Sequence, residues 1–191
     1  MNVYKLLVLN TFFALLLVGC ASRPMAPVSA GGFELKGKLS VQQNEERHSG
    51  NFLWRQQDDS GFAIEIWGPL GQGRVHLQGD DSRLALLDAK GAIVREGPSE
   101  LVMQAELGWH LPIAVMTARV TGEPDPAIPV EARSFDAEDR LESFEQAGWR
   151  IEFARFRDHD GRWLPGRIDV MRTGTRIRLV IAHWELAEEQ I

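Results

Sequence analysis

The chain lacks the residue patterns that enzymes and metalloproteins usually show. Its 191 residues include a single cysteine, so no disulfide can form within the chain and burial of apolar side chains must hold the fold. The five histidines have no metal-ligand spacing, and Asp158-His159-Asp160 is typical of a solvated turn. No G-x-S-x-G, Walker A or dinucleotide-binding glycine motif is present. We therefore expect no catalysis, no metal and no cofactor, and a protein that acts by binding.

Clustered positive charge is also missing. The chain has 21 Lys and Arg against 27 Asp and Glu, a formal net charge of −6. This sign argues against nucleic-acid binding and against adhesion to anionic lipid by charge alone. The longest apolar run, Leu6–Val18, is shorter than the roughly 20 residues that a membrane-spanning helix needs.

The start of the chain has the three parts of a bacterial signal peptide. Lys5 supplies a positive charge, an apolar stretch follows, and the small residue Gly19 precedes Cys20. Leu17-Val18-Gly19-Cys20 matches a lipobox, the motif at which the signal peptide is cut and the cysteine is lipidated. We predict a signal peptide over residues 1–19 and lipidation of Cys20, whose several acyl chains would give stable anchoring. The alternative is an ordinary signal peptide in which Cys20 has no role.

The mature chain divides into a tether and one domain. Residues 20–32 are rich in small residues and proline, which predicts a lipidated flexible tether. Residues 33–191 have the length of a single domain with its own core. Loss of Lys5 with the signal peptide brings the net charge to −7. Ala21 stands where an aspartate retains lipoproteins in the inner membrane of enteric bacteria, which predicts an outer-membrane location facing the periplasm.

From Phe33 onward, apolar and polar residues alternate with period two in many short runs. Such runs, for example Leu35–Val41 and Gly61–Trp67, predict antiparallel strands with one dry face. We count about ten or eleven strands, and a sheet of that size tends to curl. Two short helices are predicted, one from Ser99 to about Leu107 and one from Pro112 to about Val120. These helices are small for filling a curled sheet, which is a first indication of space for a ligand.

Short segments along the whole mature chain share their order and spacing with a known family. They are Gly37-Lys38-Leu39, Phe52-Leu53-Trp54, Gly68-Pro69-Leu70-Gly71, Leu107–Pro112, Gly122-Glu123-Pro124, Trp149 with Ile151 and Phe153, Leu164-Pro165, and Arg176–Leu179 with Trp184. Together with the lipobox, this order resembles the LolB family within the LolA/LolB-like lipoprotein-localisation proteins. One position departs from the family, because Arg119 stands where an aromatic residue is usual.

The resemblance implies a fold and a function. The fold is mainly β with a small α lid: an unclosed antiparallel β-barrel of about eleven strands wrapped around short helices. The function is that of an outer-membrane-anchored receptor. It accepts lipoproteins from a LolA-like periplasmic carrier, holds their acyl chains in an apolar cavity and inserts them into the outer membrane. The implied partners are the carrier, the cargo lipoproteins and outer-membrane lipid, and we expect a monomer.

The resemblance also points to two groups of site residues. It assigns membrane delivery to Leu70, between Pro69 and Gly71, because an exposed leucine in this loop passes cargo to the membrane in the family. An exposed leucine gains about 1.5–3 kcal/mol when it enters apolar surroundings. The alternative is a Leu70 folded back on the core. The candidate acyl-chain cavity consists of the apolar strand faces and one methionine of the second helix: Phe52, Trp54, Phe62, Ile64, Ile66, Leu77, Leu84, Met116, Ile151, Phe153, Ile168, Leu179 and Ile181.

Two other functions are compatible with parts of this pattern. Periodicity cannot separate a cavity from a filled core, and a scaffold lipoprotein with a filled core would bind protein partners through a sheet edge. An enzyme acting on envelope polymers would need an acid–base constellation, which the sequence lacks.

Overall fold

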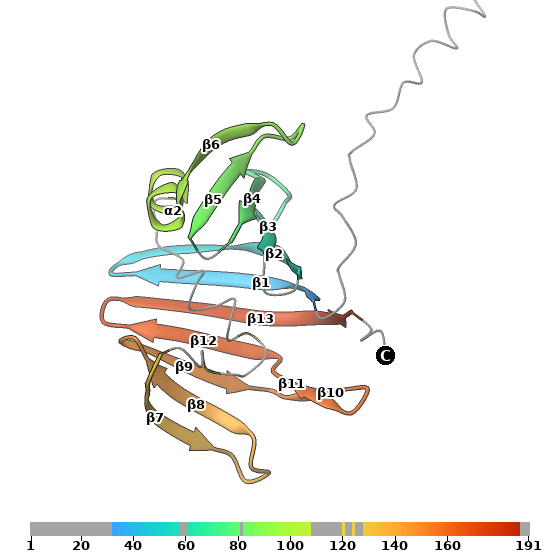
Figure 1. Cartoon of the computed structure of the whole chain (residues 1–191), viewed down its shortest axis with the longest axis vertical. Coiled ribbons are helices and arrows are strands. Elements are labelled where there is room, and N and C mark those ends of the chain that lie inside the picture. Colours follow the sequence, from blue (N-terminus) through green and yellow to red (C-terminus); the bar gives the residue numbers. More distant parts are fainter. Residues whose placement is uncertain are drawn as a thin grey trace, which may run out of the picture.

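The fold is one large, open antiparallel sheet. The computed structural model describes residues 32–57, 61–80, 82–107, 120, 124 and 128–187. Eleven strands follow the order β6-β5-β4-β3-β2-β1-β13-β12-β9-β8-β7, and β10 and β11 form a separate hairpin (Figure 1). The edge strands β6 and β7 are not hydrogen-bonded to each other, so the sheet is not closed. This confirms the predicted fold class of an unclosed antiparallel sheet of about eleven strands.

Among the residues that the structure describes, the strands follow one another as a meander, with the helix α2 between β6 and β7. The first half contains β1 (Phe33–Gln43), β2 (Glu46–Gln57), β3 (Gly61–Trp67), β4 (Val75–Gly79), β5 (Arg83–Leu87), β6 (Ile93–Pro98) and the helix α2 (Ser99–Leu107). The second half contains β7 (Val130–Phe135), β8 (Leu141–Gln146), β9 (Trp149–Ala154), β10 (Arg157–His159), β11 (Arg162–Leu164), β12 (Arg167–Arg172) and β13 (Thr175–Leu186).

The predicted helix over residues 99–107 is confirmed, whereas the second predicted helix, over residues 112–120, falls almost entirely outside the described residues. The strand β7 was not predicted. The predicted turn at Asp158–Gly161 is present but shorter, because Asp158 and His159 pair with β11 and only Asp160 and Gly161 form the turn. The strands β11 and β12 are separate because Pro165, which lies between them, has no backbone N–H to continue the ladder.

The two ends of the described chain meet in the middle of the sheet. β1 pairs with β13 from Phe33 opposite Leu186 to Gln43 opposite Thr175, with a register shift between Lys36 and Gly37. This pair joins the half of the sheet that contains β2–β6 to the half that contains β7–β12. The start of β1 and the end of β13 therefore lie at the same side of the molecule (Figure 1).

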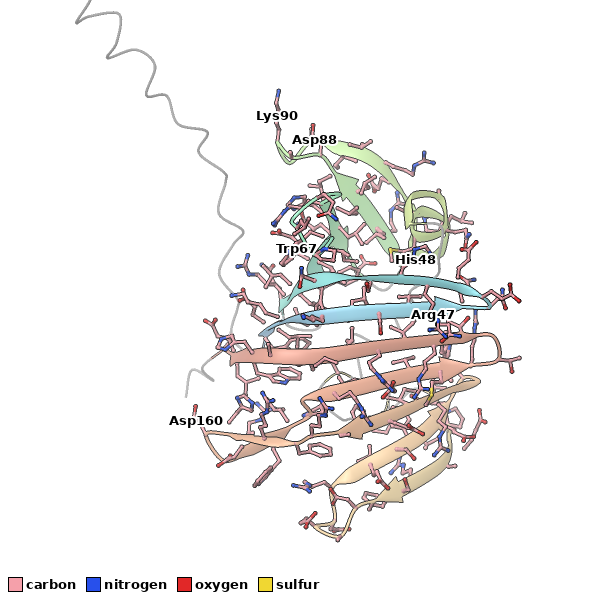
Figure 2. All side chains as sticks on the ribbon, turned by 180° about the vertical axis from the view of Figure 1, so that it is seen from behind. Arg47, His48, Trp67, Asp88, Lys90 and Asp160 are labelled. Carbon is pink, nitrogen blue, oxygen red and sulfur yellow. The ribbon has the colours of Figure 1, made fainter. Side chains whose placement is uncertain are left out.

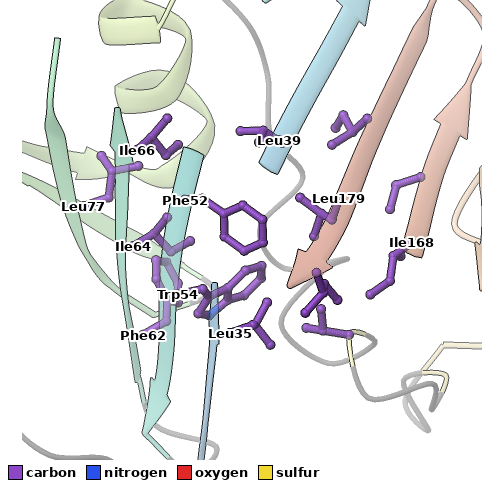
Figure 3. Close-up of a cluster of buried hydrophobic side chains, with 14 of the residues drawn as sticks. Leu35, Leu39, Phe52, Trp54, Phe62, Ile64, Ile66, Leu77, Ile168 and Leu179 are labelled. Atoms are coloured by element: carbon purple, nitrogen blue, oxygen red, sulfur yellow. The ribbon is translucent and has the colours of Figure 1, made fainter. Parts of the chain in front are cut away.

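One face of the sheet is apolar and forms the core. Trp54 is nearly fully buried, with the Phe62 ring 6.3 Å away on one side and the Phe33 ring 6.4 Å away on another. Figure 3 shows apolar side chains of β1–β4 facing those of β12 and β13 across this interior. The helix α2 adds Val102 and Met103, both buried. Because apolar and polar residues alternate with period two, one face of the sheet excludes water. The apolar side chains of the two halves of the sheet pack together on this face.

The opposite face is charged, and its ion pairs cross from strand to strand. The carboxylate of Asp169 is fully buried beneath three arginines, with Nε of Arg178 at 2.7 Å, Nε of Arg167 at 3.1 Å and Nε of Arg176 at 3.3 Å. Glu34 is also buried, and it pairs with Lys36 at 2.6 Å and with the guanidinium of Arg55 on β2. The pairs of Asp169 with β13 and of Glu34 with β2 link neighbouring strands on the outer side.

Glu34 makes the stability of this face depend on pH. Burial opposes ionisation of the carboxyl group, but hydrogen bonds from Lys36 and Arg55 outweigh it and hold the pKa of Glu34 below its ordinary value of 4.5. The unfolded chain therefore binds this proton more readily than the folded chain. The stabilisation by Glu34 is complete above the ordinary pKa and is lost as the pH falls through the lower, folded-state pKa.

We therefore expect Glu34→Gln to have a lower free energy of unfolding than the wild type at neutral pH. The difference in unfolding free energy between the two proteins should become smaller as the pH falls. Urea unfolding of both proteins across the acidic range measures this difference, and Glu138→Gln, at an exposed turn carboxylate, serves as the control. A gap that stays constant with pH would show that Glu34 does not titrate between the folded and unfolded states in this way.

Candidate functional site

The turn between β3 and β4 presents an apolar side chain to solvent. The N–H of Gly71 donates to the carbonyl of Gly68 at 2.9 Å, which closes a tight turn with Pro69 and Leu70 at its two central positions. The side chain of Leu70 is 92% exposed, the largest exposure among the large apolar residues of the described chain. Proline fixes φ at its own position, so the turn is stiff and does not fold the leucine back onto the core.

Hydrogen bonds and a cation–π contact stabilise the turn that carries Leu70. The N–H of Leu70 donates to Oε1 of Gln72 at 3.0 Å, and the N–H of Gly68 donates to the carbonyl of Gln72 at 2.8 Å. At the base of the turn, the guanidinium of Arg74 lies over the Trp67 ring, 4.6 Å from its centroid. The backbone beside Leu70 therefore has its hydrogen bonds made within the turn, and the leucine side chain remains as the apolar tip.

The second group of predicted site residues lies on the apolar face of the sheet. All of them that the structure describes are buried: Phe52, Trp54, Phe62, Ile64, Ile66, Leu77, Leu84, Ile151, Phe153, Ile168, Leu179 and Ile181. They come from β2–β5 on one side and from β9, β12 and β13 on the other, and the labelled ones point toward one another in Figure 3. Met116 lies outside the described residues, as does Arg119. Contact with acyl chains stays a prediction for this group.

Sequence reasoning left several members of the same apolar face out of the candidate cavity. Phe144 on β8 and Met103 on α2 are completely buried, and Trp184 on β13 is buried with its indole N–H donating to the carbonyl of Pro165 at 3.0 Å. Period two does not identify Phe144, because it shares its strand face with the polar residues Glu142 and Gln146. Met103 has no periodic signal either, because Val102 beside it is buried as well and the two do not share a narrow helix face.

The described residues offer apolar surfaces for binding. No three His, Cys, Asp or Glu side chains among them are grouped so that they could hold a metal ion. None of the helices in the described stretches is long and apolar enough to cross a membrane. The predicted signal peptide and Cys20 lie outside the described residues. What the geometry provides is a broad apolar interior and one exposed leucine on a stiff turn.

Comparison with known proteins identifies the family. A sequence profile described as "Outer membrane lipoprotein LolB" matches residues 31–184. The chain belongs to the LolB family. It is 35% identical over 158 residues to the outer-membrane lipoprotein LolB of Stutzerimonas stutzeri, covering 81% of this chain and 74% of that protein. It is 32% identical over 192 residues to the Marinomonas LolB, covering 96% of this chain and 98% of that protein.

The fold has a counterpart among solved structures as well. A LolA superfamily protein from Nitrosomonas europaea superposes with a TM-score of 0.55 at 10% identity, covering 88% of this chain and 90% of that one. At this identity the likeness concerns the fold alone. Membership of the LolB family confirms the resemblance, and it makes this chain an outer-membrane lipoprotein localisation factor and not an enzyme.

Proposed function

We propose that this LolB-family protein is a lipid-anchored receptor that receives lipoproteins from a LolA-like carrier and inserts them into the outer membrane. In this proposal residues 1–19 are removed, Cys20 carries the acyl chains, and residues 20–32 tether a single monomeric domain, residues 33–191, on the periplasmic side. The observation that carries the proposal is the 92% exposure of Leu70 on a stiff turn, in a chain that belongs to this family.

The apolar face of the sheet supports the binding step. Acyl chains lack polar groups, so any apolar surface that they cover contributes about 25 cal/mol per Å² to their binding. The interior between the two halves of the sheet is lined by aliphatic and aromatic side chains drawn from strands far apart in the sequence. An unclosed sheet allows its two edges, β6 and β7, to move apart and admit such chains without breaking a strand pair.

The exposed turn supports the delivery step. An apolar side chain at the tip of a turn gains nothing in water, but it gains free energy when it enters the hydrocarbon of a bilayer. The Leu70 turn is therefore suited to bring the receptor against lipid while cargo leaves it. The step needs no energy source in the receptor itself, because the acyl chains move from a protein surface to a bilayer that they prefer.

A scaffold that binds protein partners through a sheet edge is the alternative. It is favoured by β6, an edge strand on which Ile93 and Val94 are both exposed. A scaffold would capture partners by adding a strand to β6, and it would have no use for acyl chains.

Transfer of cargo from the carrier distinguishes the two functions. We expect the mature protein, mixed with carrier-bound lipoprotein, to take up the lipoprotein and to release a fluorescent acyl-chain probe as it does so. The measurements are co-purification of cargo with the receptor and the loss of probe fluorescence. The control is the same cargo made without its acyl chains, which should stay unbound. Capture of acyl-free cargo without probe release would support the scaffold and contradict the receptor.

A further inference from the structure

The β10–β11 hairpin leaves the main sheet at a fixed point. Arg155, just before it, has a left-handed φ of 58°, a conformation that non-glycine residues rarely adopt. The N–H of Gly166, just after it, donates to the carbonyls of Ala154 and Arg155, both at 3.1 Å. A Cβ added at Gly166 would lie 2.7 Å from the Arg155 carbonyl oxygen, so the two strands cross here only because residue 166 is glycine. The backbone at Arg155 and Gly166 therefore fixes the direction in which the hairpin projects.

The base of the hairpin lies next to the start of the domain. Trp184 donates its indole N–H to the carbonyl of Pro165 at 3.0 Å, and its ring lies 5.7 Å from the ring of Phe33. One side chain thus links the hairpin to the first residue of β1. In Figure 1 the hairpin projects on the side where β1 begins, and in Figure 2 Asp160 at its tip lies opposite Arg47 and His48 at the far end of β2.

The hairpin carries an exposed tryptophan in a fixed position. Trp163 is 54% exposed, and the guanidinium of Arg140 lies over its ring at 5.1 Å from the centroid. Arg140 also lies over the Phe156 ring at 4.9 Å, and it is held by Asp136 and Glu138, each at 2.7 Å. One ring face is thus supported by the β7–β8 turn while much of the indole remains in solvent. A half-exposed indole held in this way offers a large, rigid apolar surface with a polar N–H to a partner or to lipid.

Three exposed arginines lie on the same hairpin and at its base. Arg155, Arg157 and Arg162 are all exposed, and none of them has an ion-pair partner among the residues that the structure describes. Asp158 is the cross-strand neighbour of Trp163 and Asp160 lies at the tip, so residues 155–164 carry a formal net charge of only +1 in a chain that is acidic as a whole. Tryptophan is enriched at the level of lipid headgroups, where its apolar ring and its N–H are both satisfied. Arginine suits the same depth, because its guanidinium matches the geometry of phosphate groups.

We propose that the β10–β11 hairpin rests on the bilayer surface, with Trp163 at headgroup level and the three arginines beside lipid phosphates. The inference rests on the proposed function, since the anchor at Cys20 brings the bilayer to this side of the domain. The 13 residues 20–32 span at most about 45 Å when fully extended, so the start of β1 stays within that distance of the membrane. This contact would fix the orientation of the tethered domain relative to the bilayer.

A probe at the tip of the hairpin tests this contact. The full lipidated protein is placed in phosphatidylethanolamine–phosphatidylglycerol vesicles as two single-cysteine variants, Asp160→Cys and Arg47→Cys, each labelled with a polarity-sensitive fluorophore. Cys20 does not react because its sulfur is alkylated by lipid. We expect headgroup-linked nitroxide lipids to quench the probe at position 160 and to leave the probe at position 47 unquenched. Trp163→Ser in the first variant should remove most of that quenching without changing the thermal unfolding midpoint.

The outcomes separate the hairpin contact from the anchor. If the protein floats with the vesicles but the probe at position 160 is not quenched, the hairpin contact is wrong and the anchor stands. If the protein does not float, the anchor and the contact are both overturned. If the probe at position 160 responds only when a LolA-like carrier is added, the hairpin is a protein-docking element and the membrane contact is wrong.

Discussion

Replacing Leu70 by glutamate is expected to stop delivery of cargo to membranes while leaving folding and uptake of cargo from the carrier intact. The side chain is 92% exposed, so the substitution removes no core contact and the turn keeps its backbone hydrogen bonds. Loss of the leucine forfeits about 1.5–3 kcal/mol of transfer into apolar surroundings, which corresponds to roughly a 10- to 150-fold lower population of the membrane-inserted turn. The carboxylate adds a further penalty, because a charged group does not enter hydrocarbon readily.

The measurement is transfer of a radiolabelled lipoprotein from the carrier through the receptor to liposomes, with the receptor-bound and liposome-bound fractions counted separately. Leu101→Glu is the matched control, since Leu101 is another leucine with 67% exposure, on the outer side of α2. It should deliver cargo at the wild-type rate, and Leu70→Ile should as well. Accumulation of cargo on the Leu70→Glu receptor would place the defect at delivery. Delivery by Leu70→Glu at the wild-type rate would rule out the role assigned to this turn.

The sequence was sufficient for those strands whose burial alternates. Along the whole of Gly61–Trp67, half-buried side chains alternate strictly with buried ones. The apolar face of this strand could therefore be predicted residue by residue. The edge strand β7 has the same extended backbone, but Glu131, Ala132 and Arg133 are all exposed in a row. A strand that does not cover the core imposes no period on its side chains, so nothing in residues 130–135 signals it. The three-residue strands β10 and β11 are too short to show a period at all.

The candidate site divides in the same way. The apolar face follows from alternation, but the exposure of Leu70 does not, because a leucine near a turn usually gains by folding back. The stiffness that keeps it outward comes from Pro69 and from the hydrogen bonds of Gln72, which depend on the folded turn. Asp169 is a similar case on the outer face, since its position opposite Arg178 is set by the register of β12 and β13. These two strands are joined by the turn at Thr173 and Gly174, so the register depends on which residues form that turn.

Gly37→Ala is expected to cost about 3 kcal/mol, the upper part of the range for overpacking a filled space. Gly37 lies where β1 shifts its register against β13, and a Cβ added there would lie 2.1 Å from the carbonyl oxygen of Val180. The nearest atoms belong to the backbone, so they cannot rotate away as a side chain would. Relief requires that β1 and β13 move apart, and this pair joins the two halves of the sheet whose apolar side chains face each other. The glycine also belongs to the segment Gly37-Lys38-Leu39 by which the chain resembles its family.

Urea unfolding followed by tryptophan fluorescence measures this cost. The matched control is Gly97→Ala on the edge strand β6, where an added Cβ would make an ordinary contact with Cγ2 of Val102 at 3.6 Å. The control should be near neutral or slightly stabilising, since alanine lowers the conformational freedom of the unfolded chain. Equal midpoints for Gly37→Ala and the wild type would mean that β1 and β13 separate at little cost. The two halves of the sheet would then be held by their apolar side chains, and the interior could widen along this seam as well as at its free edges.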